Sequence, residues 1–300
     1  MTTPLDSVHR DRRRRRLWQQ LAWVITVLVF TFLVWGFVWE PGRLIQRDYT
    51  IALPRWPAQC DGLRADVVAD LHTGSPRNGV DKLDRVVREL AASDSDVVIM
   101  AGDYVILKVL LGKYVMPEVV AEHLKPLAAR KRVYAVLGNH DWWKGGPRVR
   151  RALESAGIIV LENQSTEISL GHCRLWLVGV GDLWEGHPDI PRAFAGVNDD
   201  APVIGITHNP DEFRHMPGRA ALVIAGLLAG WVRDALGRGP ALLPADVSIP
   251  YVIARDAAVR GKLNDPAALA RQVQRLLPVP DGQRVGLCAL DVAMGDRADV

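Results

Sequence analysis

Residues 63–72 read LRADVVADLH, a short apolar run that ends in an aspartate and a histidine. Three other runs are built in the same way: DVVIMAGD at 96–103, RVYAVLGNHD at 132–141 and APVIGITH at 201–208. Short apolar runs of this kind favour largely buried strands, and helical patterns at about 80–92 and about 117–129 lie between them. This alternation predicts an α/β domain built in layers.

Each of these runs ends in side chains that bind metals or act as acids and bases. They are Asp70, His72, Asp103, Asn139, His140, Asp141 and His208. Open α/β sheets place their sites at the carboxyl ends of strands, so we expect these side chains to converge on one edge. Carboxylate, imidazole and amide ligands together suit a pair of divalent cations such as manganese, iron or zinc. An aspartate can bridge two such ions, and ions ~3.5–4 Å apart clamp the attacking and leaving oxygens of a phosphoryl transfer.

A single Asp-x-His pair, or one histidine after a strand, is common by chance; the order of the motifs is more specific. As a set, DLHTGSP, AGDYV, LGNHDWW and THNPDEF resemble the calcineurin-like metallophosphoesterases, especially their bacterial membrane-anchored branch. The resemblance covers roughly Leu63 to Gly226 and implies a layered β-sandwich flanked by helices. GVGDLWEGHPD, at 179–189, resembles a loop that borders the site in this branch.

The resemblance also implies a role for each site residue. Asp70 and His72 would hold one metal, Asp103 would bridge, and Asn139 and His208 would hold the second. His140 would be the histidine that binds no metal and either steadies the phosphate or protonates the leaving oxygen. The implied reaction is attack of a metal-bound hydroxide on phosphorus. Asp141 is expected to support the neighbouring loop, while Trp142 and Trp143 are equally consistent with a substrate roof and with an apolar edge.

One motif of the resembled family is absent. After a strand like ALVIAG, at 221–226, the family places Gly-His-x-His, whereas here Gly226 precedes Leu227, Leu228 and Ala229. No histidine follows His215, so each metal keeps three protein ligands and should bind more weakly. The sequence therefore leaves two functions open: a metal-dependent phosphoesterase, and a pseudoenzyme that binds a phosphate ligand or a partner without turnover.

The N-terminus has the composition of a membrane anchor. Residues 1–16 carry six arginines against two aspartates, and residues 17–39 form an uncharged apolar stretch with tryptophans near both ends. About 20 apolar residues suffice to cross a bilayer, and the basic block should remain in the cytoplasm. A cleaved signal peptide and a buried core helix are the alternatives. Because the local net charge of +4 exceeds the total of +3, the remaining chain is close to neutral, and we expect no nucleic-acid partner.

These observations predict a single-pass cell-membrane protein with its domain on the extracytoplasmic side. The expected order is a basic segment (1–16), a transmembrane helix (17–39), a stalk (40–62) and a metallophosphoesterase-like domain (63–226). A divergent C-terminal segment (227–300) is expected to complete or flank this domain. The expected substrate is a phosphodiester or phosphomonoester, such as a lipid or envelope phosphate; protein partners are not indicated. Residues 266–277 suggest an amphipathic helix and 284–292 a final strand. The three cysteines permit one disulfide without selecting it.

Overall fold

The computed structural model of the chain describes residues 4–39, 42–53, 56–226, 251–254 and 284–292. Its described strands form a six-stranded sheet, in the order β1-β11-β2-β3-β4-β5, and a five-stranded sheet, in the order β10-β9-β8-β7-β6. The strands are β1 (Leu44–Ala52), β2 (Arg64–Val68), β3 (Val97–Met100), β4 (Val133–Ala135), β5 (Ile159–Val160), β6 (Gln164–Leu170), β7 (Cys173–Gly179), β8 (Val203–Thr207), β9 (Ala220–Ala225), β10 (Tyr251–Ala254) and β11 (Arg284–Val292).

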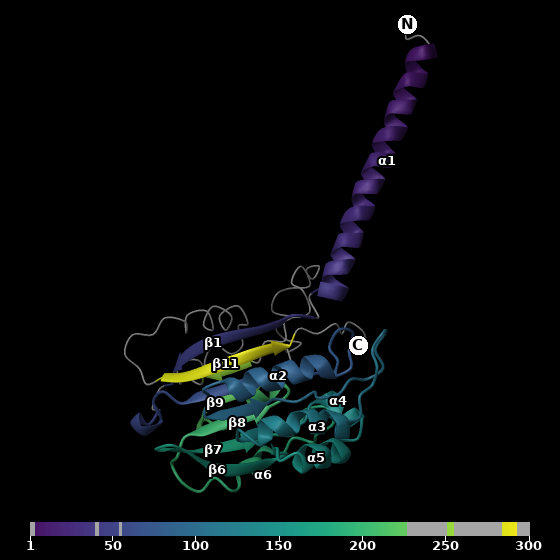
Figure 1. The fold of residues 1–300 in the computed structure, drawn as a ribbon. Coiled ribbons are helices and arrows are strands. Elements are labelled where there is room, and N and C mark those ends of the chain that lie inside the picture. The colour runs from purple at the N-terminus through teal and green to yellow at the C-terminus, as the bar shows by residue number, and fades with distance from the viewer. Residues whose placement is uncertain (1–3, 40–41, 54–55, 227–250, 255–283, 293–300) are drawn as a thin grey trace.

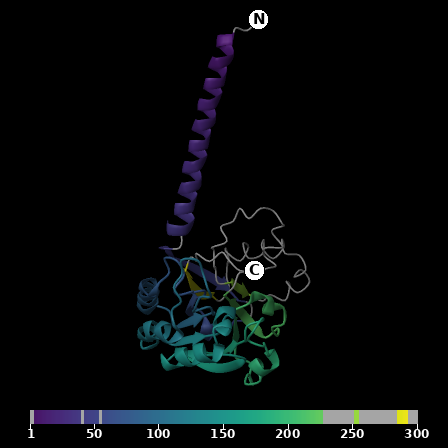
Figure 2. The same ribbon diagram turned by 90° about the vertical axis from the view of Figure 1, so that its right-hand side faces the viewer.

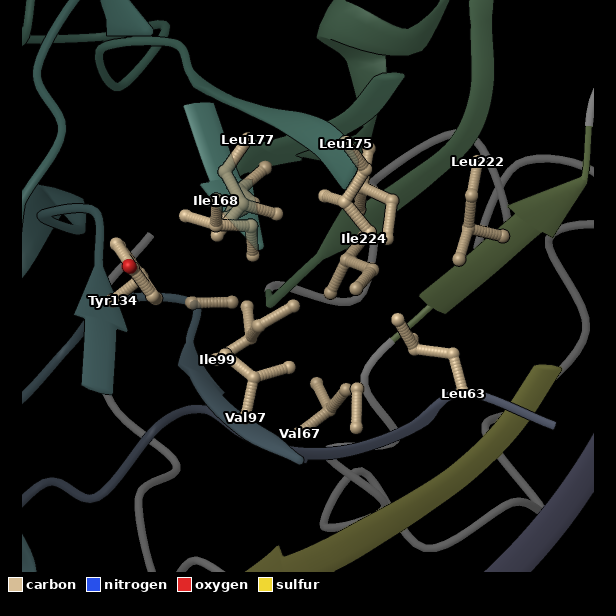
Figure 3. Close-up of a cluster of buried hydrophobic side chains, with 14 of the residues drawn as sticks. Leu63, Val67, Val97, Ile99, Tyr134, Ile168, Leu175, Leu177, Leu222 and Ile224 are labelled. Carbon is tan, nitrogen blue, oxygen red and sulfur yellow. The ribbon is translucent and has the colours of Figure 1, made fainter. Parts of the chain in front are cut away.

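The two sheets pack face to face around an apolar layer (Figure 3). Side chains alternate across each strand because successive residues of a strand point to opposite faces. In β3, Val97 and Ile99 enter the layer between the sheets, while Val98 and Met100 face outward. In β7, Leu175 and Leu177 point inward from the other side. The fold is thus the layered α/β sandwich that the sequence predicts.

Helices cover the outer face of each sheet. Apolar residues of α2, α3 and α5 bury the outer face of the six-stranded sheet, and α6 and the 3-10 helix η4 bury that of the other. The helices of the domain are η3 (Ala58–Cys60), α2 (Val80–Ala92), α3 (Pro117–Ala128), α4 (Asn139–Trp143), α5 (Gly146–Ser155), α6 (Ile190–Phe194) and η4 (Pro210–Arg214). The expected helices at about 80–92 and about 117–129 correspond to α2 and α3.

The first sheet begins earlier in the chain than the sequence suggests. The segment read as a stalk, 40–62, contains β1, which pairs antiparallel with β11 from Leu44 opposite Val292 to Ala52 opposite Arg284. Trp56 and Cys60 of the same segment are buried in the core. The prolines of the segment therefore flank a strand, whose partner lies at the far end of the chain. The expected final strand is present as β11, and the helix expected at 266–277 lies outside the described residues.

A disulfide joins Cys60 to Cys173, at the start of β7. Both residues are buried in the layer between the sheets. The bond ties the segment before β2 to the second sheet, across 113 residues of sequence.

Helix α1 (Pro4–Val34) and the π-helical turn η1 (Trp35–Trp39) precede the domain. Within them, Arg14–Val34 is long and apolar enough to cross a membrane. None of this stretch is buried against the domain, from which the helix projects (Figures 1 and 2). The apolar residues Trp23, Phe30 and Phe32 are 73%, 66% and 67% exposed, respectively.

Candidate metal centre

The polar residues that end the predicted strands meet at one edge of the sandwich. Asp70 and His72 follow β2, Asp103 follows β3, Asn139 opens α4 after β4, and His208 follows β8. Strands β2, β3 and β4 run parallel, so their carboxyl ends lie together. All five side chains are buried: Asp70 (1% exposed), His72 (2%), Asp103 (1%), Asn139 (4%) and His208 (0%).

The carboxylate of Asp103 is the centre of this group. Its Oδ2 lies 3.1 Å from Nε2 of His72 and 3.3 Å from Nε2 of His208. The same Nε2 of His72 lies 3.5 Å from Oδ1 of Asp70. The same Nε2 of His208 lies 3.1 Å from Oδ1 of Asn139. One carboxylate therefore contacts an imidazole on each side, and each imidazole contacts a second oxygen ligand.

The donor atoms fall into two overlapping sets. Ligand atoms of Asp70, Asp103 and His208 lie within 4.8 Å of one another, and so do those of His72, Asp103 and His140. Asp103 belongs to both sets, as a bridging ligand must. Oxygen and imidazole donors at this spacing fit a pair of divalent cations.

The electrostatics of the group also favour positive charge between the ligands. Burial alone would lower the pKa of His72, but Asp103 and Asp70 outweigh it and raise that pKa to about 10. Burial opposes the protonation of His208 as well, and Asp103 is the main cause that raises its pKa to about 10. The carboxylates that stabilise imidazolium here would stabilise a metal cation in the same place.

The backbone around the ligands adopts a left-handed conformation that is uncommon for residues other than glycine. The φ angles are 52° at Asp70, 37° at His72 and 59° at Asp103. Aspartate and histidine tolerate this region better than branched residues do, and such outliers concentrate at functional sites. Hydrogen bonds hold the turns together, from Asp70 N to Gly102 O (3.0 Å) and from His72 N to Asp103 O (2.9 Å).

Asp141 supports the loop that carries Asp103, as the sequence predicts. Its Oδ2 accepts hydrogen bonds from the backbone N–H groups of Asp103 and Gly138, both at 2.9 Å. Its Oδ1 accepts from Tyr104 N (2.9 Å) and Val105 N (3.3 Å). Four donors from two strand ends thus converge on one buried carboxylate, which fixes these ends relative to each other.

His140 lies at the outer side of the group. Its backbone N–H donates to Oδ1 of Asp103 (3.0 Å), and its ring meets the ring of His72 edge-on, with centroids 4.5 Å apart. Burial lowers the pKa of His140 to about 4, so the ring is neutral near pH 7. The Nδ1 of His140 is buried and makes no hydrogen bond to the part of the chain that the structure describes.

The two tryptophans after His140 occupy different surroundings. Trp142 is partly buried and packs against the apolar cluster beneath the helices. Trp143 is 46% exposed, lies 5.5 Å from the ring of His140 and stacks on Trp184, which is 52% exposed. Trp143 Nε1 donates to Glu185 Oε1 (3.1 Å), in the loop predicted to border the site. Of these two tryptophans, Trp143 is therefore the one placed to contact a molecule beside His140.

A buried acid, Asp182, and a partly buried one, Glu162, were not singled out in the sequence. Asp182 follows β7, and its Oδ2 accepts from Trp184 N (2.9 Å) and Glu185 N (3.1 Å), while burial raises its pKa. The Gly-Asp pair after a strand, as at Asp103, is the signal that would have found it. Glu162 accepts from Leu137 N (2.7 Å), and burial raises its pKa to about 8. No motif marks Glu162, because its position depends on packing.

Leu227 and Ala229, which replace the expected histidines, lie outside the described residues. The chain reaches them from the site, because Gly226 N donates to His208 O (3.0 Å).

Comparison with known proteins agrees with this arrangement. A sequence model of the family described as calcineurin-like phosphoesterase matches residues 63–226. Phosphodiesterase YaeI of Escherichia coli is 36% identical over 119 residues, which cover 39% of this chain and 42% of YaeI. A Danio rerio protein described as a transmembrane protein with metallophosphoesterase domain is 28% identical over 203 residues, 63% of this chain and 44% of that protein.

A further relative is matched over most of its length. UDP-2,3-diacylglucosamine pyrophosphatase LpxG of Chlamydia trachomatis is 24% identical over 300 residues, which cover 76% of this chain and 88% of LpxG. The chain spans less than half the length of the first two relatives.

Proposed function

Because the chain belongs to the calcineurin-like phosphoesterase family, we propose that it is a membrane-anchored phosphoesterase that hydrolyses a lipid or envelope phosphate ester. The family consists of metal-dependent hydrolases, and the observation that carries the proposal is the position of Asp103. Its Oδ2 contacts the imidazoles of His72 and His208, at 3.1 and 3.3 Å, from a buried turn between them. A single carboxylate between two imidazoles has the arrangement of a bridging ligand.

In this proposal, which follows the ligand sets that the family resemblance implies, Asp70, His72 and Asp103 hold one divalent cation, and Asp103, Asn139 and His208 hold another. The groups of donor atoms found in the structure divide these residues differently, but they also share Asp103. Manganese, iron and zinc all accept this mixture of ligands. Such cations neutralise the charge of a phosphate group and activate water as a nucleophile.

The other residues of the site position the ligands and the substrate. Asp141 holds the backbone of Asp103 through two strand ends, so the bridging carboxylate keeps its direction when substrate enters. His140 is neutral near pH 7 and lies beside the ligands, which suits a hydrogen bond between its ring and a phosphate oxygen. A pKa lowered to about 4 does not suit protonation of the leaving oxygen near pH 7. The exposed face of Trp143 borders the same position.

Three observations support the anchor and its orientation. The stretch Arg14–Val34 is apolar and none of it is buried, which counts against a soluble core helix. The arginines precede the apolar stretch, which favours a cytoplasmic N-terminus. The Cys60–Cys173 disulfide is typical of oxidising compartments, outside the cytoplasm. Since the arginines and the disulfide are independent of each other, their agreement strengthens the extracytoplasmic assignment.

The relatives support the class of substrate. YaeI is described as a phosphodiesterase, and LpxG as a pyrophosphatase of a diacylated sugar nucleotide. A domain tethered to a membrane encounters phosphate esters of lipids and of the envelope. The substrate we propose is therefore a phosphodiester or phosphomonoester of that kind.

The absent Gly-His-x-His motif favours a second function, a pseudoenzyme that binds a phosphate ligand or partner without turnover. Metal content and hydrolysis separate the two. We would purify the full chain in detergent, measure its bound metals, and assay bis(p-nitrophenyl) phosphate and p-nitrophenyl phosphate with added manganese. Bound metal together with hydrolysis supports the enzyme. If the protein binds no metal and hydrolyses neither substrate with any metal tested, the pseudoenzyme is the function that remains.

A pair of variants tests whether the site itself is responsible. Asp103→Asn should lose metal and lower hydrolysis by at least about 100-fold, because the bridging ligand and its charge are altered. Asp94→Asn is the control: Asp94 is exposed and pairs with Arg64 at the amino-terminal end of β2, away from the site. Equal activity of the two variants would remove Asp103 from the mechanism.

A further inference from the structure

An exposed apolar loop follows Asp103 after two buried residues, Tyr104 and Val105. Residues 106–116 read ILKVLLGKYVM, and the side chains of Leu110 and Leu111 at its tip are 85% and 86% exposed. Tyr114 and Met116 are also exposed, at 39% and 50%. Two adjacent leucines this open to water are unusual on a soluble domain, where exposed apolar clusters mark interaction sites.

The base of this 106–116 loop is attached to the loop that follows β2 and carries Asp70 and His72. Lys113 N donates to Gly74 O (2.7 Å), and Gly112 N donates to Val109 O (3.1 Å). Thr73 and Val105 form an isolated β-bridge at the entry to the loop. The leucines are therefore held at the tip of a fixed turn next to the site.

Leu111 adopts a positive φ of 63°. A branched side chain rarely occupies this region, and the usual residue at such a turn is glycine or asparagine. A glycine follows at position 112, yet the left-handed position is held by a leucine. The turn thus presents an apolar side chain where local backbone preference alone favours a small or polar one.

The charges around the loop are positive. Residues 104–116 contain Lys108 and Lys113 and no acidic residue. Nζ of Lys144 lies 5.0 Å from the ring centre of Tyr114, which adds a third cation at the edge of the loop. The acid that follows in sequence, Glu118, is paired with Arg148 through two hydrogen bonds of 2.7 and 2.9 Å. Apolar residues flanked by lysines complement an interface of acyl chains and anionic head groups.

The apolar anchor joins the domain at the same edge. Strand β11 runs parallel to β2, with Leu290 opposite Val68, and β1 begins at Leu44 opposite Val292. The start of β1 thus lies at the same end of the sheet as the carboxyl end of β2, from which β11 separates it. Figure 1 shows the arrow of β11 pointing toward the end of the sheet at which α1 joins β1. Four residues separate Trp39 from Leu44, and a chain of that length spans at most ~18 Å.

We propose that the 106–116 loop docks on the bilayer that holds α1, with Leu110 and Leu111 in the interface and the lysines on anionic head groups. The proposal rests on the membrane anchoring given under the proposed function. It orients the site edge toward the membrane, so the substrate class is a phosphate ester at head-group depth. The substrate would then enter the site from the same bilayer that α1 crosses.

The test places a fluorescent label on the full chain in vesicles of phosphatidylcholine and phosphatidylglycerol. In a Cys288→Ala background, Leu110→Cys carries an environment-sensitive label, and brominated lipids serve as quenchers. Asp94→Cys, at an exposed position before β3 at the opposite end of the sheet, is the matched control. Leu28→Cys, within α1, reports separately whether the anchor is inserted.

We expect the label at position 110 to shift its emission to the blue and to be quenched, with the label at position 94 unaffected. Quenching should decrease when phosphatidylglycerol is omitted, because the lysines lose their partners. If the label at 28 is quenched but the label at 110 is quenched no more than the label at 94, the loop does not dock, although the anchor is inserted; this result overturns the proposal. No quenching at 28 contradicts the anchoring itself. Disulfide-linked dimers of the unlabelled Leu110→Cys variant in detergent would instead assign the leucines to a protein interface and overturn the proposal.

Discussion

Gly226 lies against His208 so closely that no side chain fits between them. Its N–H donates to His208 O at 3.0 Å, and a Cβ on Gly226 would lie 2.9 Å from His208 Nδ1 and 2.3 Å from Ala101 O. His208 Nδ1 is itself held by Ala101 O at 2.7 Å. The end of β9 therefore sets the position of a proposed metal ligand.

Gly226→Ala should displace His208 or the Ala101 carbonyl, and it should lower both stability and metal content. We expect a loss of about 1–3 kcal/mol in the free energy of unfolding, measured by urea denaturation. Gly79→Ala is the matched control, since its Cβ would meet nothing within 4 Å. The control should change stability by less than about 0.5 kcal/mol. Equal behaviour of the two variants would show that Gly226 does not restrict His208.

Restoring the missing imidazoles should increase metal occupancy. Gly226 lies beside His208, and in sequence it is followed directly by the positions at which the resembled family has two histidines. Leu227→His with Ala229→His would complete four ligands around each proposed ion. Bound manganese or zinc and phosphodiester hydrolysis should both rise above the unchanged protein. No gain in either would mean that the segment after Gly226 leaves the site. Full activity without the substitutions would mean that three ligands per ion suffice.

Glu162 should make stability depend on pH. Burial raises its pKa from 4.5 to about 8, opposed by Leu137 N–H and Arg150 and assisted by Asp141 and Asp182. Since the fold favours the protonated acid, stability from this group is complete below pH ~4.5 and declines as pH rises through ~8. Glu162→Gln should reduce the fall in unfolding free energy between pH 6 and pH 9, measured by urea denaturation. Parallel profiles for the two proteins would refute a raised pKa.

The Cys60–Cys173 disulfide should stabilise the domain. It closes a loop of 113 residues between two buried positions, and a bond of this kind contributes about 2–5 kcal/mol. Cys60→Ala with Cys173→Ala should lower the free energy of unfolding by that amount, while Cys288→Ala should not alter the Cys60–Cys173 pairing. Peptide mapping without reductant should recover Cys60 linked to Cys173. Recovery of both as free thiols from membranes would contradict the bond and weaken the extracytoplasmic assignment.

The orientation of the anchor can be measured directly. The arginines before the apolar stretch predict that residues 1–16 are cytoplasmic and that the domain is outside. Protease added to cells with a permeable outer barrier should digest the domain and spare a cytoplasmic marker protein. Protection of the domain until the membrane is opened to the cytoplasm would reverse the topology.

Some features of this protein were accessible from sequence because they depend on near neighbours along the chain. The apolar runs before Asp70 and Asp103 predict strands, and the ends of parallel strands share an edge, so the convergence of these side chains followed. The 3.6-residue pattern predicted α2 over Val80–Ala92. The uncharged run after the arginines likewise predicted an apolar helix.

Other features required contacts between distant parts of the chain. Asp66, a buried acid in β2, accepts hydrogen bonds from the hydroxyls of Ser93 and Ser95, which are 27 and 29 residues further along the chain. The sequence suggests a stalk for the segment that contains β1. The partner strand of β1, β11, begins only at Arg284, so no neighbouring stretch of sequence indicates the pairing. Three cysteines allow three pairings, and packing of the two sheets selected Cys60 with Cys173. Periodicity records only which face of an element is apolar. Which distant group meets that face is decided when the sheets pack, and so these partners were visible in the tertiary structure alone.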